Sequence, residues 1–270
     1  MNNLPKEFKF SKKLGQNFLI DKTIPKRIVQ ESGTDGKNIL EIGPGAGALT
    51  VELASSASSV LALEVDPLLI APLKEMFATC PNVQIEHTDA LKCDIAALCD
   101  DYFGSDADVV VRANLPYAIT SPILIKLIES RRFSDVTVMV QLEVAERIAA
   151  KAGSPEYGAF SIFCQYYTEP KLLFKVPPTA FYPRPKVTSA VIKMTSKIPE
   201  FSENEKELFR LVKLAFAQRR KTLVNALSSR YDKERVLNAL QKLNFTPDIR
   251  GERLSVADFA SLAAELNKSA

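Results

Sequence analysis

The chain has 270 residues, of which 46% are hydrophobic and 25% are charged, as in an ordinary soluble globular protein. A chain of this length can bury a substantial core and favours one large domain with a smaller one. No stretch approaches the ~18 uninterrupted apolar residues of a membrane-spanning helix, and the N-terminus lacks the apolar core of a signal peptide. These features predict a cytoplasmic protein without a membrane segment.

The cysteines and the single histidine argue against a metal centre. Cys80, Cys93, Cys99 and Cys164 form no CxxC pair, and His87 has no partner at metal-ligand spacing. Free thiols are the expected state of these cysteines. A lone histidine also makes a catalytic triad hard to build. The sequence therefore predicts no metal site.

The net charge of +3 hides an uneven distribution. Residues 31–110 carry fourteen acidic and three basic residues, whereas residues 1–27, 170–199 and 206–235 each carry an excess of basic ones. Any single basic run is ordinary solvated surface, but three of them around one acidic block favour a polyanion held through its phosphates. The charge distribution indicates a nucleic-acid partner.

From residue 38 to about residue 152, short apolar runs alternate with helical patterns. The runs are NILEIG (38–43), VLALEV (60–65), VQIEH (83–87), DVVVRA (108–113) and VTVMVQ (136–141). Helical patterns follow all of them except the third, after which a longer connection comes: ALTVELASSA (48–57), PLLIAPLKEMFA (67–78), PILIKLIES (122–130) and EVAERIAAKA (143–152). Continuous Val/Ile/Leu strands with helical crossovers predict an α/β fold with a doubly wound, mostly parallel sheet. Its ligands should bind at the carboxyl ends of the strands.

The pattern changes in the second half of the chain. FSIFCQYYT (160–168), KLLFKV (171–176) and SAVIKM (189–194) predict antiparallel strands at one edge of the sheet. Four helical patterns then follow: KELFRLVKLAFAQ (206–218), KTLVNALSS (221–229), KERVLNALQKL (233–243) and VADFASLAAEL (256–266). We expect a sheet domain over residues 1–198 and a small all-α domain over residues 199–270.

The first predicted strand runs into the glycine-rich loop GPGAG, which begins two residues after Glu41. Such a loop suits a ligand that approaches the backbone at a helix N-terminus. The next strand ends in Glu64, where a carboxylate can accept hydrogen bonds from both ribose hydroxyls. The Glu41 carboxylate would repel the pyrophosphate of a dinucleotide but attract the ammonium and sulfonium of S-adenosylmethionine. Asp89, after the third strand, can accept from the adenine amino group, although a helix cap is an equally good interpretation.

The fourth strand ends in Asn114-Leu115-Pro116-Tyr117, a stretch that is either a simple turn or a site for an adenine. An adenine amino group is a poor nucleophile because its lone pair is delocalised into the ring. The Asn114 side-chain oxygen and the Leu115 or Pro116 carbonyl could bind its hydrogens and direct the lone pair at a methyl donor. Tyr117 would stack on the base, as aromatic residues do with extruded nucleotides.

An ordered set of motifs carries a resemblance to a known family. KKLGQNFLID, EIGPGAGALT, LEVD, TDAL, ANLPY, VPPTAFYPRPKVTSAVI and LAFAQRRKTLVNAL together span essentially the whole chain. In this order they resemble the bacterial family of small-subunit rRNA adenine N(6),N(6)-dimethyltransferases. The resemblance implies a Rossmann-like methyltransferase domain that uses S-adenosylmethionine and a helical domain that binds rRNA.

The resemblance also implies roles for particular residues. The cofactor contacts would be Asn17, Leu19, Gly43, Glu64, Asp89 and Asn114, and the catalytic loop would be Asn114, Leu115, Pro116 and Tyr117. Phe181 would form the second aromatic wall of the adenine pocket, unless it only anchors its proline-rich loop in the core. Arg112 departs from the apolar residue usual at its position, without touching the chemistry.

The implied reaction transfers four methyl groups to two adjacent adenosines in the 3′-terminal hairpin of 16S rRNA, within the 30S subunit or its precursor. The expected rRNA backbone contacts are Lys12, Lys13, Arg184, Lys186, Arg219, Arg220 and Lys221, although Arg219–Lys221 also suit a solvated helix end. The protein is expected to be a monomer. The order of the methyl transfers, the assembly stage recognised and any checkpoint role do not follow from the sequence.

Two alternatives remain open at this point. A large-subunit rRNA adenine methyltransferase of the macrolide-resistance type would resemble the first domain, but FYPRPKV and FAQRRKTL favour the small-subunit enzyme. A non-catalytic nucleic-acid-binding protein on a methyltransferase fold is the second alternative. An intact Asn114 argues against lost activity, and the lack of an Arg/Ser-rich leader argues against a mitochondrial relative.

Overall fold

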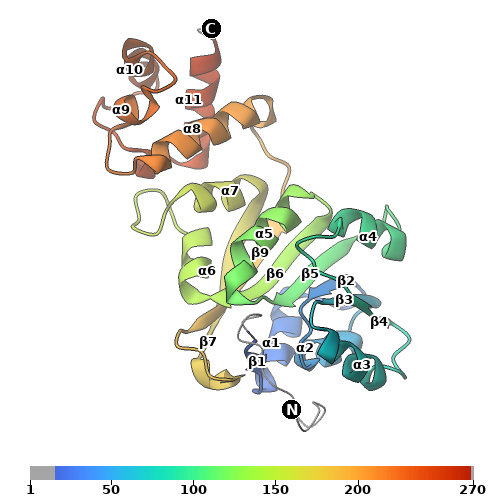
Figure 1. The fold of residues 1–270 in the computed structure, drawn as a ribbon. Coiled ribbons are helices and arrows are strands. Elements are labelled where there is room, and N and C mark those ends of the chain that lie inside the picture. Colours follow the sequence, from blue (N-terminus) through green and yellow to red (C-terminus); the bar gives the residue numbers. More distant parts are fainter. Residues whose placement is uncertain (1–15, 269–270) are drawn as a thin grey trace. The chain divides into compact units, whose positions relative to one another are not determined.

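The protein's structure, a computed structural model, describes residues 16–268 and leaves the side chain of residue 202 undescribed. A seven-stranded sheet has the order β4-β3-β2-β5-β6-β9-β7 (Figure 1). Its strands are β2 (Asn38–Ile42), β3 (Ser59–Glu64), β4 (Val83–His87), β5 (Val109–Asn114), β6 (Phe133–Gln141), β7 (Thr168–Val176) and β9 (Ser189–Ser196). The strands from β4 to β6 pair in parallel, and β9 pairs antiparallel with β6. This arrangement confirms the predicted fold class.

Helices pack around the sheet, and four of the six lie where the apolar patterns predict them. They are α1 (Thr23–Ser32), α2 (Ala48–Ala54), α3 (Pro67–Met76), α4 (Ile95–Phe103), α5 (Thr120–Glu129) and α6 (Leu142–Ile148). Buried side chains of α1 and α2 pack with Val60 and Val110, and those of α3 pack with Ala62 and Ile85. The central strands are therefore inaccessible to water along most of their length, which leaves their carboxyl ends as the place for polar chemistry.

Two helices of this region were not predicted. α1 follows the QNFL segment, and α4 lies in what the sequence presents as a long connection. Helix α4 nevertheless has a recognisable start, because the Asp94 carboxylate accepts from the Ala97 amide at 3.1 Å. It ends at Gly104, whose φ of 91° favours glycine. The acidic residues that surround α4 weaken its apolar pattern.

The prediction of a strand at FSIFCQYYT is wrong, because residues Ala159–Tyr167 form helix α7. The aromatic and β-branched residues favour a strand by propensity, but packing decides otherwise. The Ser161 hydroxyl accepts from the Gly158 amide at 3.0 Å and so closes the helix N-terminus. Phe163 and Tyr167, four residues apart on one helix face, have ring centroids 5.3 Å apart.

The last part of the chain is helical, as predicted. Its helices are α8 (Glu205–Ala217), α9 (Leu223–Leu227), α10 (Lys233–Lys242) and α11 (Val256–Lys268). Buried Leu208, Leu211 and Leu262 contribute to its core. The Glu205 carboxylate, in the first turn of α8, accepts from the Tyr167 hydroxyl of α7 at 2.8 Å. Helix α7 thus belongs with the helical part of the protein.

The chain divides into two compact units. One contains the described residues up to 145 together with Glu169–Ser196, and the other contains Glu146–Thr168 together with the described residues from Lys197 on. The sequence assigned the segment Glu146–Thr168 to the sheet domain, whereas the structure groups it with the helices. The limits of the functional domains, 1–198 and 199–270, remain a prediction.

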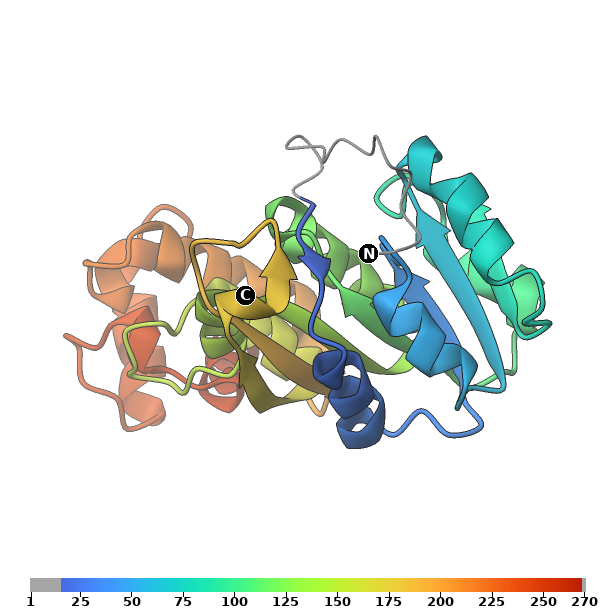
Figure 2. The same cartoon turned by 90° about the horizontal axis from the view of Figure 1, so that it is seen from below.

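A small two-stranded sheet holds the QNFL segment in place. β1 (Phe18–Leu19) pairs antiparallel with β8 (Phe181–Tyr182), with Phe18 opposite Tyr182 and Leu19 opposite Phe181. Figure 2 shows β1 in dark blue beside β8 in yellow. The Ile20 amide extends the contact by donating to the Ala180 carbonyl at 2.8 Å. Two segments far apart in the sequence are thereby joined next to the loop after β2.

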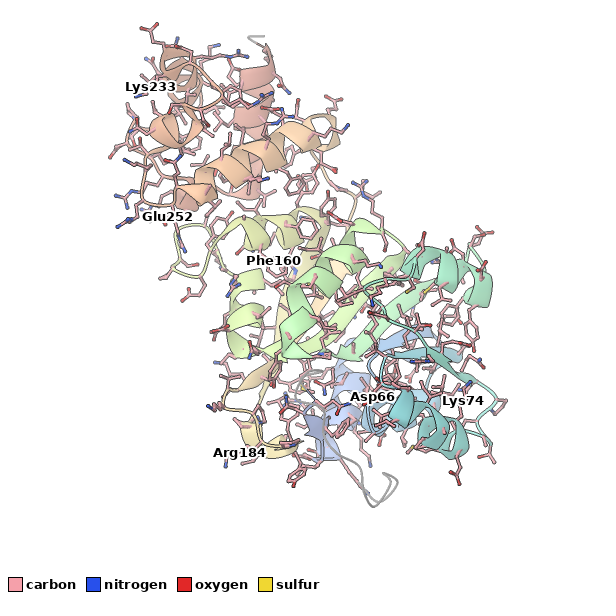
Figure 3. The ribbon with its side chains drawn as sticks, in the orientation of Figure 1. Asp66, Lys74, Phe160, Arg184, Lys233 and Glu252 are labelled. Carbon is pink, nitrogen blue, oxygen red and sulfur yellow. The ribbon has the colours of Figure 1, made fainter. Side chains whose placement is uncertain are left out.

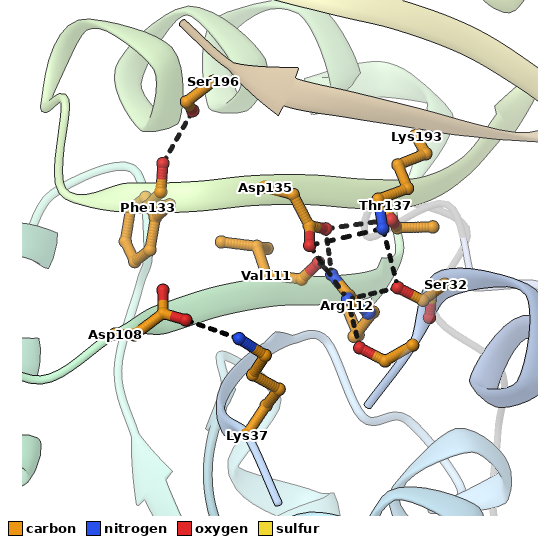
Figure 4. Close-up of polar contacts among 11 residues, drawn as sticks. Ser32, Lys37, Asp108, Val111, Arg112, Phe133, Asp135, Thr137, Lys193 and Ser196 are labelled. Carbon is orange, nitrogen blue, oxygen red and sulfur yellow. Dashed lines mark hydrogen bonds and ion pairs between the residues drawn. The ribbon is translucent and has the colours of Figure 1, made fainter. Parts of the chain in front are cut away.

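A buried charge lies in the middle of β5. The Arg112 guanidinium is fully buried and pairs with the Asp135 carboxylate of β6 (Figure 4). It also donates to the Ser32 carbonyl at 3.0 Å, at the end of α1. Lys193 of β9 donates to the same carbonyl at 2.8 Å. Arg112 thus ties α1 to the sheet, which explains how a charged residue replaces the expected apolar one.

Candidate active site

The GPGAG loop needs its glycines. Gly43, Gly45 and Gly47 all have φ between 58° and 79°, a region that side chains rarely adopt. A Cβ atom on Gly45 would lie 2.9 Å from the Phe18 ring, so this position is closed to side chains by contact as well. The loop backbone is therefore exposed to the cavity beside it, while β1 packs against it.

Glu41, at the end of β2, is a buried carboxyl group without a full set of partners. It is 1% exposed, and its Oε2 has no hydrogen-bond partner among the described residues. Burial raises the pKa of Glu41 to about 8; the Thr50 hydroxyl opposes this shift and the Glu64 carboxylate adds to it. A buried, unsatisfied acid in a cavity wall is suited to a cationic ligand.

Glu64, at the end of β3, is held rigidly by the backbone. Its Oε1 accepts from the Val65 and Asp66 amides at 2.9 and 2.8 Å, and its Oε2 accepts from the Gly45 amide at 3.1 Å. Burial raises the pKa of Glu64 above its usual value, and these three hydrogen bonds offset only part of the rise. A carboxylate has about four acceptor positions, so the group is oriented and still able to accept from a ligand hydroxyl.

Asp89, which follows β4, holds a local turn and lines the cavity, and its contact with the adenine of the donor remains a prediction. Its Oδ1 accepts from the Leu91 amide at 3.0 Å, and its Oδ2 lies 3.3 Å from the Lys92 ammonium. It stabilises a local turn rather than a helix start, because the next helix begins at Ile95 and is capped by Asp94. Its carboxylate also lines the cavity.

The Asn114–Tyr117 stretch leaves the end of β5 as a short, fixed turn. The Leu115 amide donates to the Met139 carbonyl at 3.1 Å, and the Leu115 side chain is buried. The Pro116 carbonyl accepts from the Thr120 hydroxyl at 3.1 Å and from the Ile119 amide at 3.2 Å. Asn114 is half-buried and lines the cavity.

These groups meet in one cavity. Its wall includes every residue assigned above to the cofactor and to the catalytic loop: Asn17, Leu19, Gly43, Glu64, Asp89, Asn114, Leu115, Pro116 and Tyr117. They come from five separate stretches of the chain, at the ends of β2 to β5 and on β1. The roles given to them remain predictions, but the fold brings them to one place.

Phe181 lies elsewhere. Its ring is 3% exposed and packs in the core with residues of α1, α2 and β7, and it is not among the residues that line this cavity. Tyr182, the next residue on β8, is 51% exposed. The interpretation of Phe181 as a core anchor agrees with this placement, and its role as a wall of the adenine pocket stays a prediction.

The sequence did not indicate several contacts that shape the site. The Tyr117 hydroxyl lies 2.8 Å from the Ser189 hydroxyl, which belongs to β9. The Gln16 amide donates to the Asp66 carboxylate at 2.7 Å, and the same carboxylate caps α3. Of these residues, Ser189 lies within the family motif VPPTAFYPRPKVTSAVI, but the motif assigned no role to this serine.

The candidate rRNA contacts differ in their surroundings. Arg184 and Lys186 are exposed in the loop after β8, where Figure 3 labels Arg184. Arg219 instead pairs with Glu252 at 3.1 Å and donates to the Pro155 carbonyl at 2.6 Å. Arg220 and Lys221 are exposed beside it, whereas Lys12 and Lys13 lie outside the described residues. Arg219 is thus partly occupied in holding a neighbouring loop.

Two features are absent from residues 16–268. No helix in this range is long and apolar enough to cross a membrane. The same range contains no group of three or more His, Cys, Asp and Glu side chains placed to hold a metal ion.

Known proteins share both the sequence and the fold. A model of the ribosomal RNA adenine dimethylase family matches residues 7–268. Ribosomal RNA small subunit methyltransferase A of Shouchella clausii is 46% identical, over 96% of this chain and 90% of its own length. Its counterpart in Alkaliphilus oremlandii is 45% identical, over 97% and 93%.

Two solved structures match along almost their whole length. A dimethyladenosine transferase from Plasmodium falciparum has a TM-score of 0.79 and 28% identity, and the match covers 93% of this chain and 98% of that one. The 23S rRNA methyltransferase ErmE has a TM-score of 0.75 and 25% identity, over 93% and 100%. The family model spans both compact units, and the glycine loop, the strand-end acids and the Asn114 turn share one cavity. This chain belongs to the ribosomal RNA adenine dimethylase family.

Proposed function

We propose that this enzyme uses S-adenosylmethionine to dimethylate the N6 atoms of two adjacent adenosines in the 3′-terminal hairpin of 16S rRNA. The observation that carries the proposal is the single cavity shared by the strand-end acids and the Asn114 turn. The choice of the small subunit follows the relatives at 45–46% identity, whereas the 23S enzyme ErmE is 25% identical.

The residues present suit this methyl donor. Glu41 offers an unsatisfied buried carboxyl to the donor's positive charge, and Glu64 offers a fixed acceptor to its ribose. Asp89 would accept from the adenine amino group, while Asn17, Leu19 and Gly43 would complete the wall around the donor. When bound there, S-adenosylmethionine supplies an electrophilic methyl group.

The Asn114 turn would hold the acceptor nitrogen. The Asn114 side-chain oxygen would accept one hydrogen of the amino group, and a main-chain carbonyl would accept the other. Because the Pro116 carbonyl already accepts from Thr120 and Ile119, the Leu115 carbonyl is the better of the two choices. No strong base is needed, since the proton leaves after the methyl group has moved.

Tyr117 would stack on the base, and Phe181 would form the opposite wall according to the family resemblance. Because Phe181 is buried in the core, this second role requires its own test. A Phe181→Leu variant, which keeps an apolar core, should lose methyl transfer if the ring touches the base. Unchanged transfer in that variant would leave Phe181 as a core residue only.

The basic side chains would contact the rRNA backbone of the 30S subunit or its precursor, with the protein acting as a monomer. Exposed Arg184, Lys186, Arg220 and Lys221 are the favoured contacts, and Arg219 would contribute while bridging to Glu252. Contacts of this kind weaken with salt because counterions are released on binding.

The proposal is tested by incubating the enzyme with methyl-labelled donor and unmethylated small subunits and then mapping the label. We expect dimethyladenosine at two neighbouring positions of the 3′-terminal hairpin. Asn114→Ala provides the matched control for contaminating activity. Label on the large subunit, or on another nucleotide of 16S rRNA, would contradict the proposed substrate.

A further inference from the structure

The Tyr117 ring is tethered by a hydrogen bond from outside its own turn. Its hydroxyl lies 2.8 Å from the hydroxyl of Ser189, which is fully buried. Tyr117 itself is half-buried and lines the cavity, so part of the side chain is accessible to a ligand. Either hydroxyl can donate in this pair.

Ser189 is a rigid anchor for this tether. It is the first residue of β9 and lies opposite Gln141 in the antiparallel pair with β6. Directly before it, the Thr188 carbonyl accepts from the Leu142 amide at 2.9 Å. Strand β6 also pairs with β5, where Met139 lies opposite Asn114. The anchor and the acceptor-binding residue are therefore fixed by the same three strands.

Tyr117 is less buried than Ser189 and belongs to a short turn, whereas Ser189 belongs to a strand of the sheet. It begins a 3-10 turn of three residues (Tyr117–Ile119) that contains no buried residue. A tyrosine side chain in such a place loses rotational freedom when its hydroxyl is bound, and a base then meets a ring already in position. Ser189 is fully buried and is not among the residues that line the cavity, so its hydroxyl would not bind the base itself.

We propose that Ser189 is a positioning residue that sets the plane of the Tyr117 ring for the incoming adenine. This inference rests on the proposed function and adds a residue that acts on the base only through Tyr117. A net hydrogen bond of ordinary strength corresponds to roughly a 3- to 10-fold change in kcat/KM.

A double-mutant cycle tests the coupling. Ser189→Ala and Tyr117→Phe should each lower kcat/KM for methyl transfer by the same factor, and the double variant should be no worse than either. Donor affinity should stay unchanged in all three, and Ser189→Thr, which keeps the hydroxyl, should recover activity. Ser196→Ala removes a hydroxyl from the same strand that donates to the Phe133 carbonyl at 2.6 Å, and it should behave as wild type.

A second readout does not depend on the reaction. The ring signal of Tyr117 in a tyrosine-labelled NMR spectrum is the one that disappears in Tyr117→Phe. This signal should shift and broaden in Ser189→Ala but not in Ser196→Ala. An unchanged signal, or losses in kcat/KM that multiply in the double variant, would overturn the inference. Failure of the wild-type enzyme to methylate small subunits would instead count against the proposed function.

Discussion

Glu41 and Arg112 lie opposite each other on the paired strands β2 and β5, and both are buried, but the protein treats them differently. Arg112 pairs with Asp135 and donates to two carbonyl groups at the end of α1. Glu41 keeps an oxygen without a partner among the described residues and faces the cavity. Apart from its Nε atom, the Arg112 guanidinium finds its partners within the protein and supports the fold, whereas the cavity-lining Glu41 carboxyl has an unpartnered oxygen that a cationic ligand could engage.

The largest effect should come from the acceptor side of the cavity. Asn114→Ala removes the side-chain oxygen that would bind the adenine amino group, and we expect methyl transfer to fall by about 100- to 1,000-fold. Donor binding should remain measurable by calorimetry because Glu41 and Glu64 are unchanged. Full activity in this variant would remove the catalytic assignment.

Disrupting the Arg112–Asp135 pair should lower the stability of the fold. Arg112→Met leaves the buried Asp135 carboxylate with only Lys193 at 3.6 Å and the Thr137 hydroxyl at 3.1 Å, and the free energy of unfolding should fall by about 3 kcal/mol. Replacing both residues, as Arg112→Met with Asp135→Val, should recover part of this loss. Urea denaturation measures both variants. If the single variant unfolds like wild type, the pair around Arg112 does not stabilise α1 against the sheet.

Removing the Glu64 carboxylate should weaken binding of the methyl donor more than it destabilises the fold. Glu64→Ala would lose the charge-assisted hydrogen bond that the remaining acceptor position of the carboxylate offers to the ribose, and donor affinity should fall by roughly 10- to 100-fold. The midpoint of thermal unfolding should change little by comparison, because burial raises the pKa of this carboxyl and limits its contribution to stability. Equal donor affinity in the variant and the wild type would contradict the ribose role.

The buried Glu41 carboxyl should make donor binding depend on pH. The pKa of Glu41 is raised to about 8, so the free protein holds this carboxyl protonated at neutral pH. A positively charged donor favours the ionised form, and binding therefore releases a proton. Affinity should rise by up to about tenfold per pH unit between roughly pH 5.5 and 7.5, where the donor's own ammonium stays charged.

Glu41→Gln is the control for this prediction. The variant should bind the donor more weakly at pH 7.5 and show a flat pH dependence. Without donor, the wild type should lose stability relative to Glu41→Gln as pH rises from about 4.5 to about 8, because the carboxyl ionises in the unfolded chain over this range but stays protonated in the folded protein. A wild-type affinity that does not change with pH would mean that Glu41 does not ionise on binding.

The sequence was sufficient to predict the parallel strands, because their apolar runs recur at regular intervals along the chain. The apolar runs fixed the parallel strands, and the parallel sheet then placed Glu41, Glu64, Asp89 and Asn114 at one edge. It failed where packing overrides propensity, as at Phe160–Tyr167, whose aromatic residues favour a strand but form a helix against Phe209. It also gave no sign of partners distant in the chain, such as Asp135 for Arg112.

Packing that the sequence does not reveal also explains why Phe181 lies in the core and not in the cavity wall. A motif indicates that an aromatic ring stands near a site, but burial is decided by which face of the strand each residue takes. On β8, Phe181 faces the core and Tyr182 is exposed. The Ser189 hydroxyl likewise acquires a partner only when β9 pairs with β6 and places it beside Tyr117.

A structure of the enzyme with a donor analogue and the target hairpin would address the central claim most directly. We expect the donor to lie across the ends of β2, β3 and β4, with an adenine amino group bonded to the Asn114 side-chain oxygen and the Leu115 carbonyl. A donor bound elsewhere, or an Asn114 side chain directed away from the base, would contradict the account.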